Sequence, residues 1–147
     1  MTLPFETTIK VRDTCLCLHM QRAARALARR FDEAFRPFGL TSGQFSLLIS
    51  LNRPQPPTMA PVARLLAMDR TTLIAALKPL ELQGLVSVAV NQQDRRSRLL
   101  ILTDRGREVL AAVVPIWRAT LADVQADLST VTPDQLVVAM GELVSSK

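Results

Sequence analysis

The stretch from Thr58 to Gly106 restricts the fold of this 147-residue chain more than any other part of it. Its apolar spacing predicts one helix over 58–66 and a second over 70–83, joined by a turn at 67–69. Thr58 and Asp69 are candidate N-caps, and Gly84 is the residue type that ends helices. A strand rich in β-branched residues follows at 85–90, then a polar tip at 91–97 and a return strand at 98–102.

The charge of the chain is concentrated in the same stretch. The whole sequence has 18 Lys and Arg against 13 Asp and Glu, a formal net charge of +5. Eight basic and four acidic residues lie between Arg64 and Arg107, so this part carries most of the positive excess. A basic surface favours an anionic partner. Two helices, a tight turn and a basic hairpin in this order predict a winged helix-turn-helix domain that binds double-stranded DNA.

Segments before this stretch are predicted to be helical as well. Residues 1–13 show no periodicity and are expected to form an arm. From 14 to 37, apolar residues recur every three or four positions, which indicates one amphipathic helix ending before Pro37 and turning through Gly39. Thr41 and Gln44 match a capping box, so a short helix is predicted from there to about Asn52. Three prolines make residues 53–57 a loop.

Two helices are predicted after the hairpin. Thr103 caps the first, which contains Pro115, and the run Thr132-Pro133-Asp134-Gln135 starts the second. The fold class is therefore mainly α with a small β-hairpin wing, an α+β winged helix-turn-helix. We predict a single domain over 1–147, with a DNA-binding lobe at 41–106. The apolar faces at 14–37 and 107–145 indicate dimerisation helices.

Several functional classes find no support in the sequence. No apolar run approaches the roughly 20 residues that a bilayer span requires, and the N-terminus has no secretory signal. A cytoplasmic protein without a membrane anchor is expected. No carboxylate pair, nucleophile elbow, P-loop or zinc spacing is present, so neither an enzyme nor a cofactor is expected. On one helix Cys17 would point away from Cys15 while His19 returns to the Cys15 face, so the three side chains cannot converge on a metal ion.

Motifs along the chain resemble those of the MarR family of bacterial transcription regulators. The resemblance covers about Cys15 to Leu128, and its parts are Gly39-Leu40-Thr41, Gln44-Phe45, Met68 to Leu73, Leu80-Glu81, Gly84-Leu85-Val86, Asp94-Arg95-Arg96 and Leu102 to Gly106. It implies a homodimer whose N- and C-terminal helices interlock and hold two lobes over a near-palindromic operator. It also implies a repressor that is released by a small anionic or phenolic ligand, or by oxidation.

The candidate DNA-binding residues fall into two groups. The helix from residue 70 offers donors to bases and phosphates, namely Arg70, Thr71, Thr72 and Lys78. The hairpin would reach an adjacent minor groove with Asp94, Arg95, Arg96 and Arg98. By resemblance, Asp94 and Arg96 form a salt bridge while Arg95 reaches the DNA. Ile74 and Ala75 depart from the family pattern, which shifts the expected affinity toward phosphate contacts and DNA shape.

Two further groups are candidates for regulation. His19, Arg22 and Phe45 are expected near a ligand pocket, although His19 is also explained as a core or interface residue. Cys17 resembles the reactive cysteine of peroxide-sensing relatives, but the chain has no Tyr to activate it. A buried, inert thiol is the preferred interpretation. The alternatives kept are a thiol-based peroxide sensor or enzyme using Cys17, and a winged helix that binds protein instead of DNA.

Overall fold

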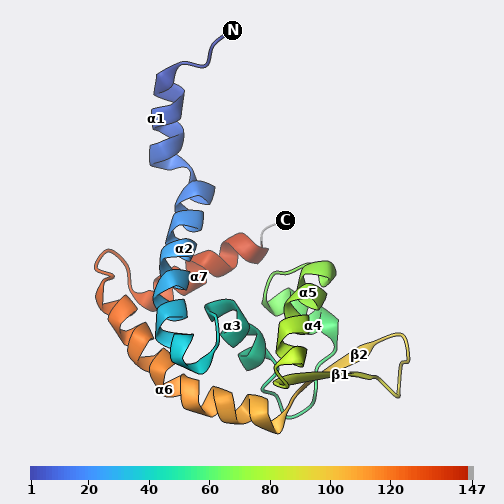
Figure 1. Ribbon diagram of the computed structural model, residues 1–147. Helices are drawn as coiled ribbons and strands as arrows, with labels where there is room; N and C mark the ends of the chain where they lie inside the picture. Colours follow the sequence, from blue (N-terminus) through green and yellow to red (C-terminus); the bar gives the residue numbers. More distant parts are fainter. Residues whose placement is uncertain (146–147) are drawn as a thin grey trace.

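The computed structural model describes residues 1–145, which form seven α-helices, one short 3-10 helix and one antiparallel two-stranded sheet (Figure 1). The elements are α1 (Phe5–Thr14), α2 (Leu16–Phe35), η1 (Arg36–Phe38), α3 (Ser42–Ser50), α4 (Met59–Leu65), α5 (Arg70–Leu82), β1 (Val86–Val90), β2 (Arg98–Leu102), α6 (Asp104–Ala126) and α7 (Pro133–Ser145). This mainly α winged-helix architecture confirms the predicted fold class. The predicted domain ran to residue 147, so its last two positions lie outside the described residues.

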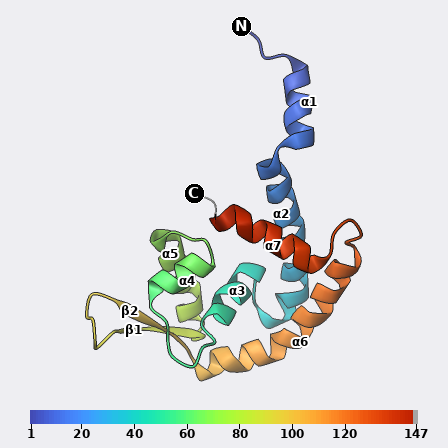
Figure 2. The same cartoon turned by 180° about the vertical axis from the view of Figure 1, so that it is seen from behind.

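The molecule has two parts (Figures 1 and 2). The lobe consists of α3, α4, α5 and the β1–β2 hairpin, and the hairpin projects from it as the wing. The terminal layer consists of α1, α2, the second half of α6 and α7. Helix α6 connects the two parts, because it starts directly after β2 and packs against α2. Helix α1 continues beyond α2, away from the rest of the chain.

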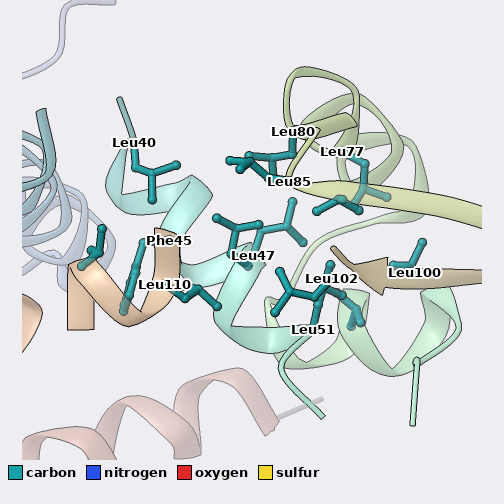
Figure 3. Close-up of a cluster of buried hydrophobic side chains, with 14 of the residues drawn as sticks. Leu40, Phe45, Leu47, Leu51, Leu77, Leu80, Leu85, Leu100, Leu102 and Leu110 are labelled. Atoms are coloured by element: carbon teal, nitrogen blue, oxygen red, sulfur yellow. The ribbon is translucent and has the colours of Figure 1, made fainter. Parts of the chain in front are cut away.

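One hydrophobic core holds the lobe together (Figure 3). Its members are buried apolar side chains from the end of α2, the segment before α3, helices α3, α4 and α5, the hairpin and the first half of α6. They are Phe35, Leu40, Phe45, Leu47, Leu48, Leu51, Val62, Leu73, Leu77, Leu80, Leu85, Val86, Leu100, Leu102, Leu110 and Val113. Burial of this many large side chains is the main favourable term in folding the lobe. The predicted inner face of α5 is confirmed by Leu73, Leu77 and Leu80.

Helix starts follow the predicted capping chemistry closely. Thr41 Oγ1 accepts from the Gln44 amide at 3.2 Å, and the Thr41 amide donates to Gln44 Oε1 at 3.0 Å. Asp69 Oδ1 accepts from the Thr72 amide at 2.7 Å. Thr103 Oγ1 accepts from the Gly106 amide and donates to the Gly84 carbonyl at 2.7 Å. Each bond satisfies a backbone donor or acceptor that a helix end leaves free.

The prediction for Thr58 was only half right. Thr58 precedes α4 in the N-cap position, but its side chain makes no capping hydrogen bond. Its backbone instead pairs with Leu99 of β2, and the Leu100 amide donates to the Pro57 carbonyl at 2.8 Å. The loop before α4 therefore lies along the wing's second strand and fixes the start of α4 against the sheet.

At Gly106 the backbone of α6 lies close against the base of the wing. A Cβ atom at this position would lie 2.3 Å from the Leu85 carbonyl oxygen and 2.7 Å from Leu102 Cδ1. Only glycine allows α6 to approach the backbone at the base of the wing this closely. Gly84 ends α5 with φ of 73°, as predicted from its place after the last apolar residue.

The first residues correct the prediction of an irregular arm. Residues 5–14 form α1, with Pro4 at the N-cap, Glu6 in the first turn and Arg12 in the last. These charges favour a helix by opposing its dipole. None of its residues is buried, so the helix lacks the apolar periodicity that a packed face produces.

Helix α6 is the one element among the described residues that is long and apolar enough to match a membrane span by length and composition. Its first half belongs to the lobe core through Gly106, Leu110 and Val113. Core helices of soluble proteins also have this length and composition. Val109, Val114, Ile116 and Trp117 of the same helix are partly buried against this core.

Candidate nucleic-acid interface

Helix α5 presents a polar and a basic face because its other face is fixed in the core. Leu73, Leu77 and Leu80 anchor the helix. Residues four apart lie above one another on a helix, so Arg70, Ile74 and Lys78 form one row on the outer surface. All three are exposed, and Ile74 keeps 37% of its surface accessible. The amino end of α5 is thus free to meet a ligand.

The tip of the wing is a compact hydrogen-bonded turn. The Asn91 amide donates to the Ser97 carbonyl at 3.1 Å, and Asn91 Nδ2 donates to Ser97 Oγ at 3.0 Å. Asp94 Oδ1 accepts from the Arg96 amide at 3.1 Å and lies 3.7 Å from Arg96 Nε. The salt bridge that the resemblance implied is therefore present. Since the Arg96 side chain is 96% exposed, solvent screens this pair, and the backbone bond does more to shape the tip.

The remaining arginines of the wing differ in their freedom. Arg98 Nη1 donates to the carbonyls of Arg95 and Ser97, at 3.1 and 3.3 Å, so its guanidinium turns back on the tip. Among the described residues, the Arg95 side chain has neither an ion pair nor a hydrogen bond. Arg95 is thus an exposed cation at the wing tip that is available to a ligand.

A groove of about 260 Å³ separates α5 from the wing. We call it the α5–wing groove. Its lining combines four cations, one acid and four apolar side chains: Arg70, Lys78, Arg96, Arg98, Glu81, Met59, Ile74, Leu77 and Val88. Cations on both walls favour an anionic chain between them. The sequence had pointed to all four cations, but it had not paired the two walls or identified Met59, Glu81 and Val88.

The other predicted DNA-binding residues lie outside this groove. Thr71 and Thr72 are exposed in the first turn of α5, and Asp94 and Arg95 are at the wing tip. Asp69 supports that first turn, and the hydrogen bond from the Thr72 amide lowers the pKa of its carboxyl group. Asp69 is therefore an anion at the helix start at neutral pH, where the helix dipole favours negative charge.

The three residues predicted to form a ligand pocket do not come together in the single chain. His19 Nε2 lies 2.7 Å from the Arg12 carbonyl and Nδ1 lies 3.5 Å from Arg22 Nη1. Both residues line a hollow of about 550 Å³ on α2. Phe45 is instead a core residue, with its ring centroid 5.0 Å from Phe35 and 6.2 Å from Trp117. Its place in the sequence did not reveal these two distant aromatic partners.

The cysteines also correct the sequence interpretation. Cys17 is exposed in the chain, so the expectation of a buried thiol is wrong; its sulfur accepts from Gln21 Nε2 at 3.5 Å. Cys15 is not inside a helix but at the N-cap of α2, where its sulfur accepts from the Leu18 amide at 3.4 Å. Across residues 1–145 no group of three His, Cys, Asp or Glu side chains could hold a metal ion.

The chain is similar in sequence to known DNA-binding transcription regulators. Residues 40–106 match a family described as a winged helix DNA-binding domain. BadR, a transcriptional activatory protein of Rhodopseudomonas palustris, is 31% identical over 118 residues, covering 78% of this chain and 67% of BadR. MprA, a transcriptional repressor of Escherichia coli K12, is 30% identical over 134 residues, covering 90% of this chain and 74% of MprA.

A solved structure shows the same fold with nucleic acid. The transcriptional regulator MosR of M. tuberculosis, crystallised with DNA, superposes with a TM-score of 0.81 at 34% identity. The match covers 89% of this chain and 94% of MosR. Fold, basic groove and relatives lead to one assignment: the chain belongs to the MarR family of winged-helix DNA-binding transcription regulators.

Proposed function

We propose that this transcription regulator is a homodimeric repressor that binds a near-palindromic operator through α5 and the wing. The observation that carries the proposal is the α5–wing groove, where cations from two elements face each other across about 260 Å³. In this arrangement the amino end of α5 enters the major groove. The cations of the groove hold the sugar–phosphate backbone, which fixes the register of the protein on the duplex.

Arg95 has a separate role in this proposal. It is the free cation at the wing tip, and the narrow minor groove of A·T-rich DNA attracts arginine through its focused negative potential. Asp94 and Arg96 hold the tip in one conformation, so Arg95 is presented without a large loss of chain entropy.

Dimerisation through the terminal layer is supported by the exposed surface of the single chain. Its accessible area is 10526 Å². A compact monomer of 16.2 kDa exposes only about 7,500 Å². The excess is roughly 3,000 Å² per chain, or about 6,000 Å² for two chains, which is the size of a large obligate dimer interface. Apolar side chains on α1, α2 and α7 account for part of it: Phe5, Val11, Leu16, Leu27, Val137, Val138 and Val144 are all at least 40% exposed.

Binding to DNA upstream of the protein's own gene tests the DNA-binding step. Fluorescence anisotropy at two salt concentrations, against a scrambled duplex of equal length, should give tight and sequence-selective binding that weakens with salt. Analytical ultracentrifugation of the same sample should give two protein chains per duplex. Binding without sequence preference would favour a winged helix that contacts protein, and a monomeric complex would contradict the dimer.

Repression is the expected sign of regulation, since a dimer seated on an operator competes with RNA polymerase. The relatives include both a named activator and a named repressor, so the sign needs its own test. Expression of a reporter fused to the operator should rise when the gene for this regulator is deleted and fall when that gene is restored. A fall in reporter expression on deletion would identify an activator.

Because its target is chromosomal DNA, we place the protein in the cytoplasm.

We propose that a small anionic ligand regulates the protein by releasing it from its operator. The hollow on α2 is lined by His19, Arg22, Ala23, Arg25, Ala26 and Arg29. Within residues 1–145, Arg22, Arg25 and Arg29 have no acidic partner, so an anion there would be attracted by three uncompensated charges. A panel of small carboxylates and phenolates should include one that releases the operator from wild-type protein but not from Arg22→Gln. Release from both proteins would exclude this hollow.

Oxidation of Cys17 is a second candidate signal, favoured by the exposure of its side chain. Cumene hydroperoxide should then release the operator from wild-type protein and leave the Cys17→Ser variant bound. Equal release from both would remove Cys17 as a sensor.

We propose that the protein has no enzymatic activity of its own, so peroxide should not be consumed beyond one equivalent per thiol.

A further inference from the structure

The outer face of α5 carries an apolar patch in the middle of a basic surface. Thr71, Ile74 and Ala75 stand three and four positions apart, so their side chains are neighbours on the helix. All three are exposed, and Ile74 is 37% accessible. We call them the apolar patch. A ligand that covers the Ile74 side chain and the methyl groups of Thr71 and Ala75 would gain free energy by removing them from water.

Cations surround the patch on the helix and across the groove. Arg70 lies one turn before Ile74 and Lys78 lies one turn after it. Arg96 and Arg98 reach the same groove from the wing. A partner that covers the patch must therefore combine a strongly anionic frame with an apolar group. A protein surface of mixed charge fits this frame poorly, whereas DNA offers phosphates on both sides of its base edges.

The chemistry of the patch restricts which base edges it can read. Neither Ile74 nor Ala75 can donate or accept a side-chain hydrogen bond. The C5-methyl group of thymine is the apolar group that base pairs display in the major groove. We propose that Thr71, Ile74 and Ala75 contact thymine methyl groups, so that sequence selectivity comes from methyl contacts. This inference rests on the proposed DNA-binding function and specifies how the bases are read.

Deoxyuridine in place of thymine tests the contact directly, because it removes the methyl group and leaves every hydrogen-bonding group in place. An operator is first selected from random duplexes with the wild-type protein. Each thymine is then replaced singly by deoxyuridine, and affinities are measured by anisotropy. Burial of one methyl group corresponds to about a fourfold change in affinity. We expect one or two thymines per half-site to show a loss of about this size.

Two variants identify the side chain responsible. Ile74→Ala should bind thymine and deoxyuridine operators with nearly equal affinity at the sensitive position. Leu82→Ala, which removes a 90% exposed apolar side chain from the far end of the same helix, should keep the full difference. A methyl group also alters DNA stiffness, but that effect persists in Ile74→Ala, so the cycle separates contact from shape.

The possible outcomes separate failure of the methyl contact from failure of the proposed DNA-binding function. Selective DNA binding with no loss on any deoxyuridine substitution would overturn the methyl contact and leave the regulator intact. A loss of equal size in wild type and Ile74→Ala would overturn the role of Ile74. Failure of the selection to enrich any sequence would overturn both the proposed operator binding and the inference. A fourfold loss abolished by Ile74→Ala alone would establish the contact.

Discussion

The lobe and the terminal layer differ in what their apolar residues do. Within residues 1–145, all 16 buried hydrophobic residues lie between Phe35 and Val113. By contrast, α1 and α7 contribute none, although α7 exposes Val137 and Val138 at 63% each. The lobe therefore folds around contacts within one chain, whereas the terminal layer has an apolar surface suited to a second chain. Apolar periodicity alone does not distinguish the two.

Truncating one residue in each part should separate them most strongly. Leu48 is 0% exposed, so Leu48→Ala is expected to lower the free energy of unfolding by about 2–5 kcal/mol. Val137→Ala should mainly weaken the dimer, and its effect should therefore depend on protein concentration. Urea denaturation at several concentrations measures both. Equal, concentration-independent losses would contradict the division into two parts.

Two glycines provide the next comparison. Gly106→Ala places a methyl group against the Leu85 carbonyl oxygen, and the overpacking should cost about 1–3 kcal/mol of stability. Gly141 in α7 has nothing within 4 Å of an added Cβ. Gly141→Ala should therefore stabilise the protein by up to about 1 kcal/mol, since alanine is the better helix former. Thermal unfolding of both variants checks the sign, and destabilisation by both would mean that a partner chain covers Gly141.

Charge should matter for DNA binding in the lobe and not in the terminal layer. Arg95→Ala is expected to weaken operator binding and to reduce the slope of log affinity against log salt by about one. Arg118→Ala removes the same charge from α6 and serves as the matched control, with an unchanged slope expected. Anisotropy titrations over a range of salt give both slopes. A wild-type slope for Arg95→Ala would place the wing tip away from the phosphates.

The smallest expected effect concerns the cap of α5. The Thr72 amide lowers the pKa of Asp69 from its ordinary value of 3.8. A lowered native pKa contributes stability that is complete above the unfolded value and is lost as pH falls through the native one. Asp69→Asn keeps a capping oxygen but does not titrate. Its free energy of unfolding, relative to wild type, should rise as the pH falls below about 4. A constant difference would exclude this linkage.

Much of the lobe could be predicted because its signals are local. The caps at Thr41, Asp69 and Thr103 and the stop at Gly84 each depend on residues within four positions. The return strand at 98–102 was predicted to the residue, since the polar tip marks its start and the Thr103 cap of the next helix marks its end. Local chemistry therefore explains why helix starts and hairpin strands were found from the sequence alone.

Errors arose where the deciding contact was distant or outside the chain. The aromatic packing of Phe45 was missed because its partners, Phe35 and Trp117, lie 10 and 72 positions away, and the ligand pocket itself stays a prediction. Cys17 was expected to be buried because free cysteines usually are, yet most of the first half of α2 is exposed in the single chain. Helix α1 has no packed face, so no apolar periodicity in the sequence indicated it. Its terminal charges, Glu6 and Arg12, were the available signal.

Pro115 stands in the middle of α6, between the half that carries the buried residues and the half that belongs to the terminal layer. Proline has no amide hydrogen, so the carbonyl four positions earlier loses its helical partner and the helix is weakest there. From this joint to the start of α6 is about 17 Å of helix, so a bend of about 5° moves the base of the wing by roughly 1.5 Å. Helix α6 is thus a lever with a built-in pivot. In the proposed dimer, a ligand that shifts α2 by a small amount would therefore change the spacing of the two wings.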